Sequence, residues 1–440
     1  MKAFVAVLAV FAMTCAPLAI AGFASAAGER DLTPVVEQGS TDRLGGGDWI
    51  SVRAGDARVG VVYGTAAYVN KVYVFAEYKR FLGGADLYDG RDNYLRTSGI
   101  PVYTIFGQAF DGMVEFQDRN NDSLLNQYRL ERNDTSGDAP SKATSLARAW
   151  TATAPTTEVA GNTTWVNFTV ETRNVPYDRV WTGLGTLPRR GTPADGALDH
   201  LAFTFHLNIT VRDVLGSVPW YKVSVNDGAA REITHVEFLG NRTYSGQAIA
   251  MGAKYDHLIE GWDFARPADL LALETRAFVG HYIPQRVGEF IHIAHRSEAR
   301  DPSGYHQRAN DTVAPDPRLL TRDVVYFDDE WYQVGRLVWQ SDVTVDGVPE
   351  TMRFQVQGGE GFAARHNGAA FLGFAVRGAY IYPAGGTIFH DPGLDAVSDL
   401  WDLPETLNLT PFTVLAIQVG IAAIAMGAAV LVRAKGRRAA

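Results

Sequence analysis

The feature that most constrains this chain is an uninterrupted apolar run close to its C-terminus. Residues 411–432 (PFTVLAIQVGIAAIAMGAAVLV) contain no charged side chain. As an α-helix rising 1.5 Å per residue, the run is about 33 Å long, which matches the hydrocarbon thickness of a bilayer. Arg433, Lys435, Arg437 and Arg438 follow at once, and basic flanks stay on the cytoplasmic side. The run therefore predicts a single membrane-spanning helix with a basic cytoplasmic tail at 433–440.

The N-terminal segment agrees with that topology. Lys2 is followed by an apolar stretch over 3–21 and by the small residues Ala24-Ser25-Ala26, which is the layout of a secretory signal peptide over 1–26. The N-terminus of the mature protein is thus expected outside the cell membrane and the C-terminus in the cytoplasm.

The remaining chain divides by composition. Residues 27–47 are polar and end in three glycines, which predicts a flexible leader, and residues 391–410 predict an acidic connector to the membrane. Between them, residues 48–390 predict a β-rich extracellular region of one large or two contiguous domains. The Gly- and Pro-rich stretch 183–198 is the candidate break between two such domains.

Charge and cysteine content restrict the kinds of partner that the protein can bind and the ways in which its fold can be stabilised. The formal charge is −9, and it becomes −14 for the predicted exterior once Lys2 and the four basic tail residues are left out. An acidic exterior argues against nucleic acid as a partner. The one cysteine, Cys15, lies in the predicted signal peptide, so the mature protein must be held by its core, and 46 % hydrophobic residues suffice for that.

Asparagine usage is the most specific compositional signal. Eight of the 15 asparagines begin an Asn-x-Ser/Thr sequence, the acceptor of N-glycosylation, and chance predicts fewer than about two. These are Asn121, Asn133, Asn162, Asn167, Asn208, Asn241, Asn310 and Asn408. A cysteine-free, acidic exterior with many such sites on one C-terminal span resembles archaeal cell-surface glycoproteins in general layout.

Alternation of apolar and polar residues predicts the fold class. Residues 201–211 (LAFTFHLNITV) place apolar side chains on one face and Asn208 on the other, and residues 165–172 do the same with Asn167 outward. Asp-Gly pairs at 227–228 and 346–347 predict tight hairpin turns. The expected fold is all-β, a mostly antiparallel sandwich-type ectodomain, plus the transmembrane α-helix. Residues 268–276 fit a short helix, and residues 287–300 fit either a helix or a strand.

One loop has the spacing of a cation site. Asp118, Asn120 and Asp122 place oxygen side chains at alternate positions, as calcium-binding loops do. Ser123 replaces the usual glycine and Arg129 replaces the usual final carboxylate, so a polar surface turn is the competing interpretation. Calcium is the one cofactor that the sequence suggests.

Two functions follow as expectations. The first is a non-enzymatic, N-glycosylated surface protein, anchored in the membrane by a single span, with a structural role or a face that binds carbohydrate or another surface protein. The second is a membrane-anchored carbohydrate-active enzyme, for which the acidic run 328–330 beside Trp331 is the candidate feature. No residue is assigned a catalytic role.

Overall fold

The computed structural model describes residues 31–41, 47–66, 71–119, 121–125, 138–177, 196–226, 233–283, 324–328, 333–339, 341–366 and 369–401. All regular elements in these ranges are β-strands, and the pairings are antiparallel apart from one between β4 and β10. The predicted all-β class is therefore confirmed for the described residues.

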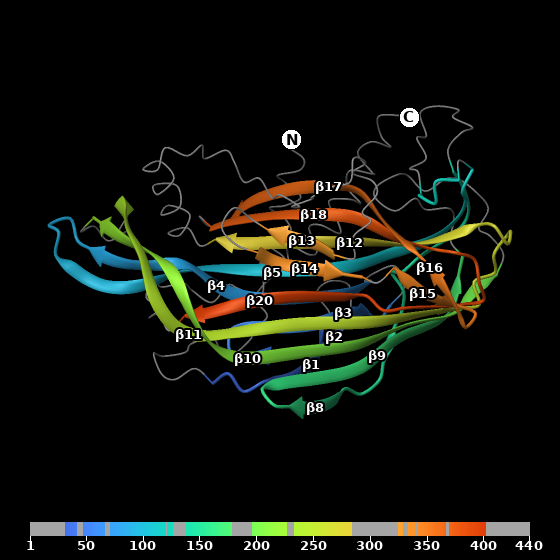
Figure 1. Cartoon of the computed structure of the whole chain (residues 1–440), viewed down its shortest axis with the longest axis horizontal. Coiled ribbons are helices and arrows are strands. Elements are labelled where there is room, and N and C mark those ends of the chain that lie inside the picture. Colours follow the sequence, from blue (N-terminus) through green and yellow to red (C-terminus); the bar gives the residue numbers. More distant parts are fainter. Residues whose placement is uncertain are drawn as a thin grey trace.

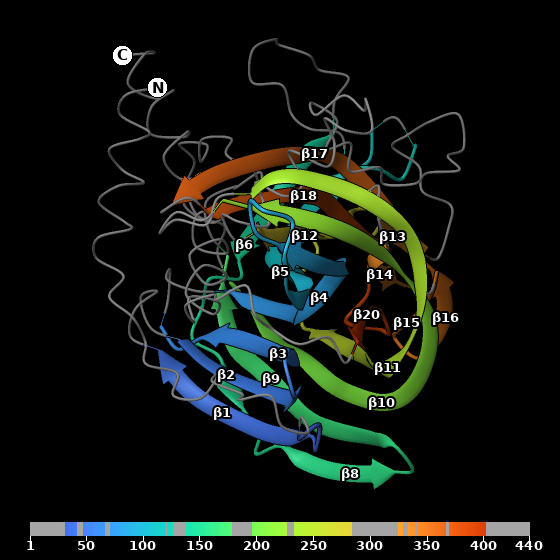
Figure 2. The ribbon, with the colours of Figure 1, turned by 90° about the vertical axis from the view of Figure 1, so that its left-hand side faces the viewer.

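The strands belong to one hydrogen-bonded sheet that folds over into two layers (Figure 1 and Figure 2). Neighbouring strands of the first layer run in the order β1 (Val35–Thr41), β2 (Gly47–Ala54), β3 (Ala57–Gly64), β4 (Val72–Tyr88), β5 (Tyr94–Gln117), β12 (Leu270–Ile283), β18 (Ala369–Tyr382) and β17 (Arg353–His366). The short β6 (Ala139–Ser145) pairs with the end of β5.

The second layer is built around two long strands, β10 (Ala197–Val225) and β11 (Ile233–Glu260). On one side lie β9 (Thr163–Pro176), β7 (Thr151–Ala152) and β8 (Thr156–Ala160). On the other lie β20 (Gly393–Trp401), β19 (Thr387–His390), β14 (Gln333–Val338), β13 (Val324–Asp328), β15 (Asp342–Val345) and β16 (Val348–Thr351). Figure 2 shows the curled ends of β10 and β11 nearest the viewer.

The core lies between the inner faces of the two layers. Phe110 of β5 packs against Phe203 of β10 with ring centroids 4.5 Å apart, and against Tyr255 of β11 at 5.4 Å. Tyr380 of β18 likewise lies 5.8 Å from His257 of β11. Burial of these rings from water is the main stabilising contribution in a chain whose described part has no disulfide.

The predicted alternation in β10 is confirmed. Apolar side chains at 201, 203, 205, 207 and 209 are fully buried, whereas Thr204, His206, Asn208 and Thr210 are partly exposed on the opposite face. In β9, Val166, Phe168 and Val170 are buried in the same way. Period-2 patterning therefore set both strands correctly.

Three segments differ from the sequence-based expectation. β1 forms within the predicted leader 27–47 and pairs with β2 along its whole length, because Glu37 binds Arg53 and Arg58 of the neighbouring strands. β20 lies within the predicted connector 391–410 and pairs with β11 and β14. The short helix fitted to 268–276 is wrong: most of it belongs to β12, which is paired on both sides.

The predicted turn at Asp346-Gly347 is confirmed. Asp346 has φ 50° and Gly347 has φ 79°, the positive angles of a two-residue hairpin turn, and β15 and β16 flank it. The returning strand is β16, and Arg353 then begins β17 in the first layer.

No helix in the described ranges is long and apolar enough to cross a membrane. The predicted signal peptide 1–26, span 411–432 and tail 433–440 lie outside the described residues.

Candidate functional site

The most extensive set of interacting polar side chains lies on the surface of β9, β10 and β11. Alternate residues of these strands point away from the core, and the pairing register brings them into rows. We call this surface the outer polar face. Its members are Trp165, Asn167, Thr169, Glu171 and Arg173 of β9, His200, Thr204, His206 and Asn208 of β10, and Lys254, Asp256 and Glu260 of β11.

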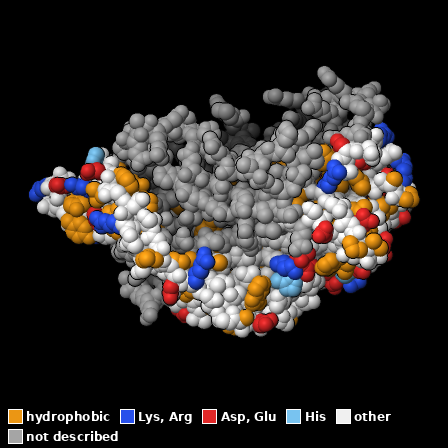
Figure 3. Space-filling view, in the orientation of Figure 1, with side chains coloured by type: hydrophobic (Ala, Val, Ile, Leu, Met, Phe, Trp, Pro, Cys, Tyr) orange, Lys and Arg blue, Asp and Glu red, His pale blue; other side chains and the backbone are white. Residues whose placement is uncertain are grey.

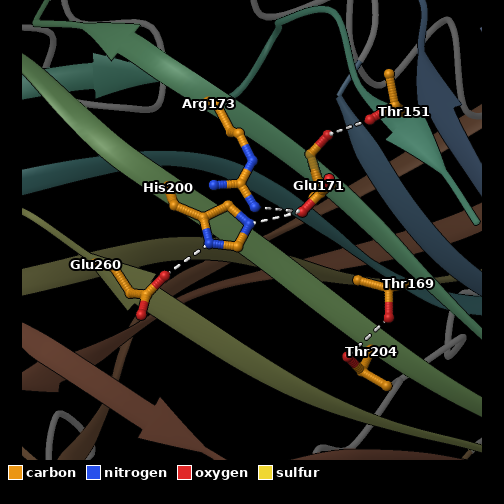
Figure 4. A network of polar contacts seen from close by, with 7 residues as sticks. All are labelled: Thr151, Thr169, Glu171, Arg173, His200, Thr204 and Glu260. Carbon is orange, nitrogen blue, oxygen red and sulfur yellow. Dashed lines mark hydrogen bonds and ion pairs between the residues drawn. The ribbon is translucent and has the colours of Figure 1, made fainter.

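At one end of the outer polar face, His200 joins all three strands (Figure 4). Its Nε2 lies 2.8 Å from Oε2 of Glu171 on β9, and its Nδ1 lies 2.7 Å from Oε2 of Glu260 on β11. Arg173 approaches the same Glu171 oxygen at 3.2 Å. Because the imidazole is largely buried and both of its nitrogens face carboxylates, the ring acts as a cross-strand clamp.

This clamp alters the charge behaviour of Glu171. The hydrogen bond from His200 lowers the pKa of the Glu171 carboxyl, and the Arg173 guanidinium adds to the effect. Glu171 is therefore held as a carboxylate, and its Oε2 is bound by both His200 and Arg173. Such a group is a poor general acid.

The next rows continue the polar contacts along the strands. The Thr169 and Thr204 hydroxyls lie 3.1 Å apart. His206 Nδ1 donates to Asn167 Oδ1 at 2.8 Å, while its Nε2 lies 3.4 Å from Asp256 Oδ2. The hydrogen bond from His206 engages the oxygen of the Asn167 amide, so the amide nitrogen points away from His206.

A second acidic group borders the rows. Lys254 Nζ lies 3.4 Å from Asp256 Oδ1 and 3.1 Å from Asp391 Oδ2. Burial raises the pKa of Asp391, and a hydrogen bond with Asp256 adds to the rise. These two carboxylates share one ammonium group, which accounts for their proximity without a bound cation.

Asn167 and Asn208 are the groups of the outer polar face that are available for covalent modification. No described residue accepts a hydrogen bond from Asn167 Nδ2, the atom that N-glycosylation modifies. Asn208 lies over Gly252, where a Cβ would sit only 2.6 Å from the Asn208 amide nitrogen. Trp165 is the cross-strand neighbour of Asn208 and lies two residues before Asn167 on the same face.

The remaining predicted acceptor sites are distributed around the molecule. Asn121, Asn162 and Asn241 are exposed, and Asn162 Nδ2 donates to the Val211 carbonyl at 3.0 Å. Three others, Asn133, Asn310 and Asn408, lie outside the described residues.

The candidate calcium loop is held by its own backbone. Asp118 accepts hydrogen bonds from the Asp122 and Ser123 amides at 3.2 and 2.7 Å, and Asp122 Oδ1 accepts from the Leu124 amide at 2.8 Å. Ser123 has φ 56°, the left-handed conformation that glycine adopts at this position of a calcium loop. Asn120 lies outside the described residues, so the calcium interpretation stays a prediction.

Sequence reasoning missed a polar cluster inside the core. His257 of β11 hydrogen-bonds to the Tyr382 hydroxyl of β18, which lies 3.1 Å from His390 Nδ1 of β19. Burial lowers the pKa of His257 well below its usual range, so this ring is neutral at pH 7. The cluster ties the two layers together, and no linear motif signals it because His257 lies 125 residues from Tyr382 and 133 from His390 in the chain.

The acidic run considered for a carbohydrate-active enzyme is only partly visible. Asp328 ends β13, whereas residues 329–331 lie outside the described residues. Among the described residues, no group of three or more His, Cys, Asp or Glu side chains is arranged to hold a metal ion. Comparison of the chain with family models, with curated proteins and with solved structures gives no match.

Proposed function

We propose that this chain is an N-glycosylated cell-surface protein, anchored in the membrane by one span, whose β-sandwich ectodomain has a structural or partner-binding role. The observation that carries the proposal is the position of the acceptor asparagines. Asn167 and Asn208 lie on adjacent strands of the outer polar face, on the side of the sheet opposite the buried core residues. Glycans there would extend into solvent without disturbing the packing.

The contacts of the outer polar face favour a scaffold over a reaction centre. Glu171 and Glu260 are bound to His200, and Asp256 and Asp391 are bound to Lys254. Acid–base catalysis needs carboxylates whose pKa values are set apart and whose oxygens can reach a substrate. Carboxylates engaged in cross-strand bonds instead stabilise the sheet.

The membrane anchor rests on the sequence alone. A stop-transfer segment at 411–432 followed by four basic residues would leave residues 27–410 outside the cell. An acidic, glycosylated exterior would then remain soluble at the membrane surface.

Protease treatment of intact cells that produce the full chain tests this topology. We expect the ectodomain to be digested from outside while the protein stays with the membrane fraction. Replacing Ile421 and Ile424 by Arg costs about 2.5–3.5 kcal/mol for each charge at the centre of the span. That variant should leave the membrane fraction, whereas the matched Ile421→Leu/Ile424→Leu control should remain. A full chain that resists external protease and is recovered in the cytosol would refute the proposal.

A further inference from the structure

The two layers are joined at one end by an arm that projects from the body of the molecule (Figure 1). The arm consists of residues 83–99 of β4 and β5 together with the described part of residues 212–246 of β10 and β11. Within it, β4 and β10 pair in parallel from Gly84 and Trp220 to Tyr88 and Ser224.

The arm is held by specific contacts and continues the strands of both layers. The Trp220 ring lies flat on Gly84, where a Cβ would come within 2.2 Å of it, and Trp220 Nε1 donates to Asp86 at 2.9 Å. Arg242 stacks 4.3 Å above the Trp220 ring and binds the same Asp86 carboxylate at 3.1 Å. These contacts fix β11 against β10, and the side of β11 that faces away from β10 is the edge of the arm.

That edge is open. β11 pairs with β19 and β20 only over residues 246–260, so among the described strands residues 233–245 are paired on one side alone, by β10. Unpaired N–H and C=O groups on an edge strand are a ready template for another strand.

Apolar side chains accompany the open edge. Phe238 is 49 % exposed, Leu239 is 45 % exposed, and Leu215 on the adjoining strand is 75 % exposed. Figure 3 shows hydrophobic and basic side chains gathered at this left-hand end of the molecule. Large exposed apolar side chains on an edge favour association.

Two features of the edge counteract such pairing. Leu239 is an extra residue in a β-bulge, and the following Gly240 has φ 98°, so the strand bends there. Immediately after the bulge comes Asn241, exposed and followed by Arg242 and Thr243, which completes an N-glycosylation sequence.

The charged residues on the edge are placed so that the edges of two copies complement each other. Glu237 lies on one side of the bulge and Arg242 on the other. When two copies meet antiparallel about a two-fold axis at the bulge, Glu237 of each copy lies beside Arg242 of the other, whose guanidinium binds Asp86 through Nη2 and carries five N–H donors in all. A closed two-fold dimer uses the same patch on both subunits in this way.

We propose that the open edge of the arm, residues 233–245, pairs with the same edge of a second copy of this chain, and that an N-linked glycan on Asn241 blocks this pairing. The proposal rests on the N-glycosylation put forward above. A bulky, hydrated glycan beside the bulge would separate two edges that otherwise approach to about 4.8 Å. Occupancy of Asn241 would then set whether the surface protein is monomeric or dimeric.

Disulfide trapping in the full chain on cells tests the proposal, because the only natural cysteine, Cys15, lies in the predicted signal peptide. Leu239→Cys places a thiol beside the expected two-fold axis. It is combined with Thr243→Ser, which keeps the glycosylation sequence, or with Thr243→Ala, which removes it. Val159→Cys, at a 68 % exposed apolar position of β8, reports random collision.

After mild oxidation we expect disulfide-linked dimer in the Leu239→Cys/Thr243→Ala variant at least tenfold above the Val159→Cys control. The Thr243→Ser partner should stay at the control level, with Asn241 modified by mass spectrometry. Dimer at the control level in the Thr243→Ala variant would overturn the edge proposal and leave glycosylation intact. Equal dimer in both variants with Asn241 modified would overturn the blocking role of the glycan. Unmodified Asn241 together with every other acceptor site unmodified would overturn the proposed glycosylation itself.

Discussion

Replacing Phe203 by alanine is the sharpest test of the two-faced structure of β10. Phe203 is fully buried and lies 4.5 Å from Phe110 and 5.7 Å from Trp150 between ring centroids. Removing such a side chain costs about 3–5 kcal/mol in the free energy of unfolding, since the transfer term and the cavity term add. At 1.4 kcal/mol per decade, the unfolding equilibrium shifts roughly 100-fold to several-thousand-fold.

The adjacent residue supplies the matched comparison. Thr204 points to the outer polar face, where its hydroxyl hydrogen-bonds to that of Thr169 at 3.1 Å. Thr204→Ala should therefore cost only about 0.5–1.5 kcal/mol. Urea unfolding followed by tryptophan fluorescence measures both, with the shift in midpoint read at unchanged slope. Equal midpoint shifts for Phe203→Ala and Thr204→Ala would refute the assignment of inner and outer faces.

Three further predictions concern charge, a cation and a turn. His200 lowers the pKa of Glu171 in the folded protein. The stabilisation from this carboxylate is therefore complete above the ordinary glutamate pKa of 4.5 and is lost as the pH falls through the lower pKa of the folded state. Glu171→Gln should reduce the loss of thermal stability at acid pH by less than about 1 kcal/mol, since the group is partly exposed. If Asp118 and Asp122 hold calcium, the ion should raise the melting temperature and Asp118→Ala should abolish the shift, whereas an unchanged melting temperature in the native chain would leave the loop a surface turn. Gly347→Ala should destabilise the protein by about 1–2 kcal/mol, because Gly347 has φ 79°; a neutral effect in urea unfolding would contradict the turn geometry.

The sequence was most informative where burial differs between two faces. The alternation at 201–211 is confirmed for the apolar residues 201–209 and for Thr204, His206, Asn208 and Thr210, whereas Ala202 is buried and Val211 is only partly buried. The Asp-Gly pair at 346–347 predicts the turn correctly, and both signals are local. The helix predicted for 268–276 is wrong because Leu270, Leu271 and Leu273 suit a helix as well as a strand, and only the two neighbouring strands in the sheet decide between them.

The candidate site depended on register, which composition does not reveal. Glu171, His200 and Glu260 are far apart in the chain and meet only because β9, β10 and β11 pair in one particular alignment. β20 differs from the predicted connector for a similar reason, because its partners β11 and β14 are distant in sequence. β1 pairs with the next strand, β2, but it has only two apolar residues, Val35 and Val36, and so shows no alternating pattern.

The most direct test of the central claim is site-by-site glycopeptide mass spectrometry of the full chain purified from membranes of a host that performs N-glycosylation. A surface glycoprotein of this design should carry glycans on Asn167 and Asn208, on the face opposite the core. Recovery of the peptides containing both asparagines in unmodified form only would contradict the account.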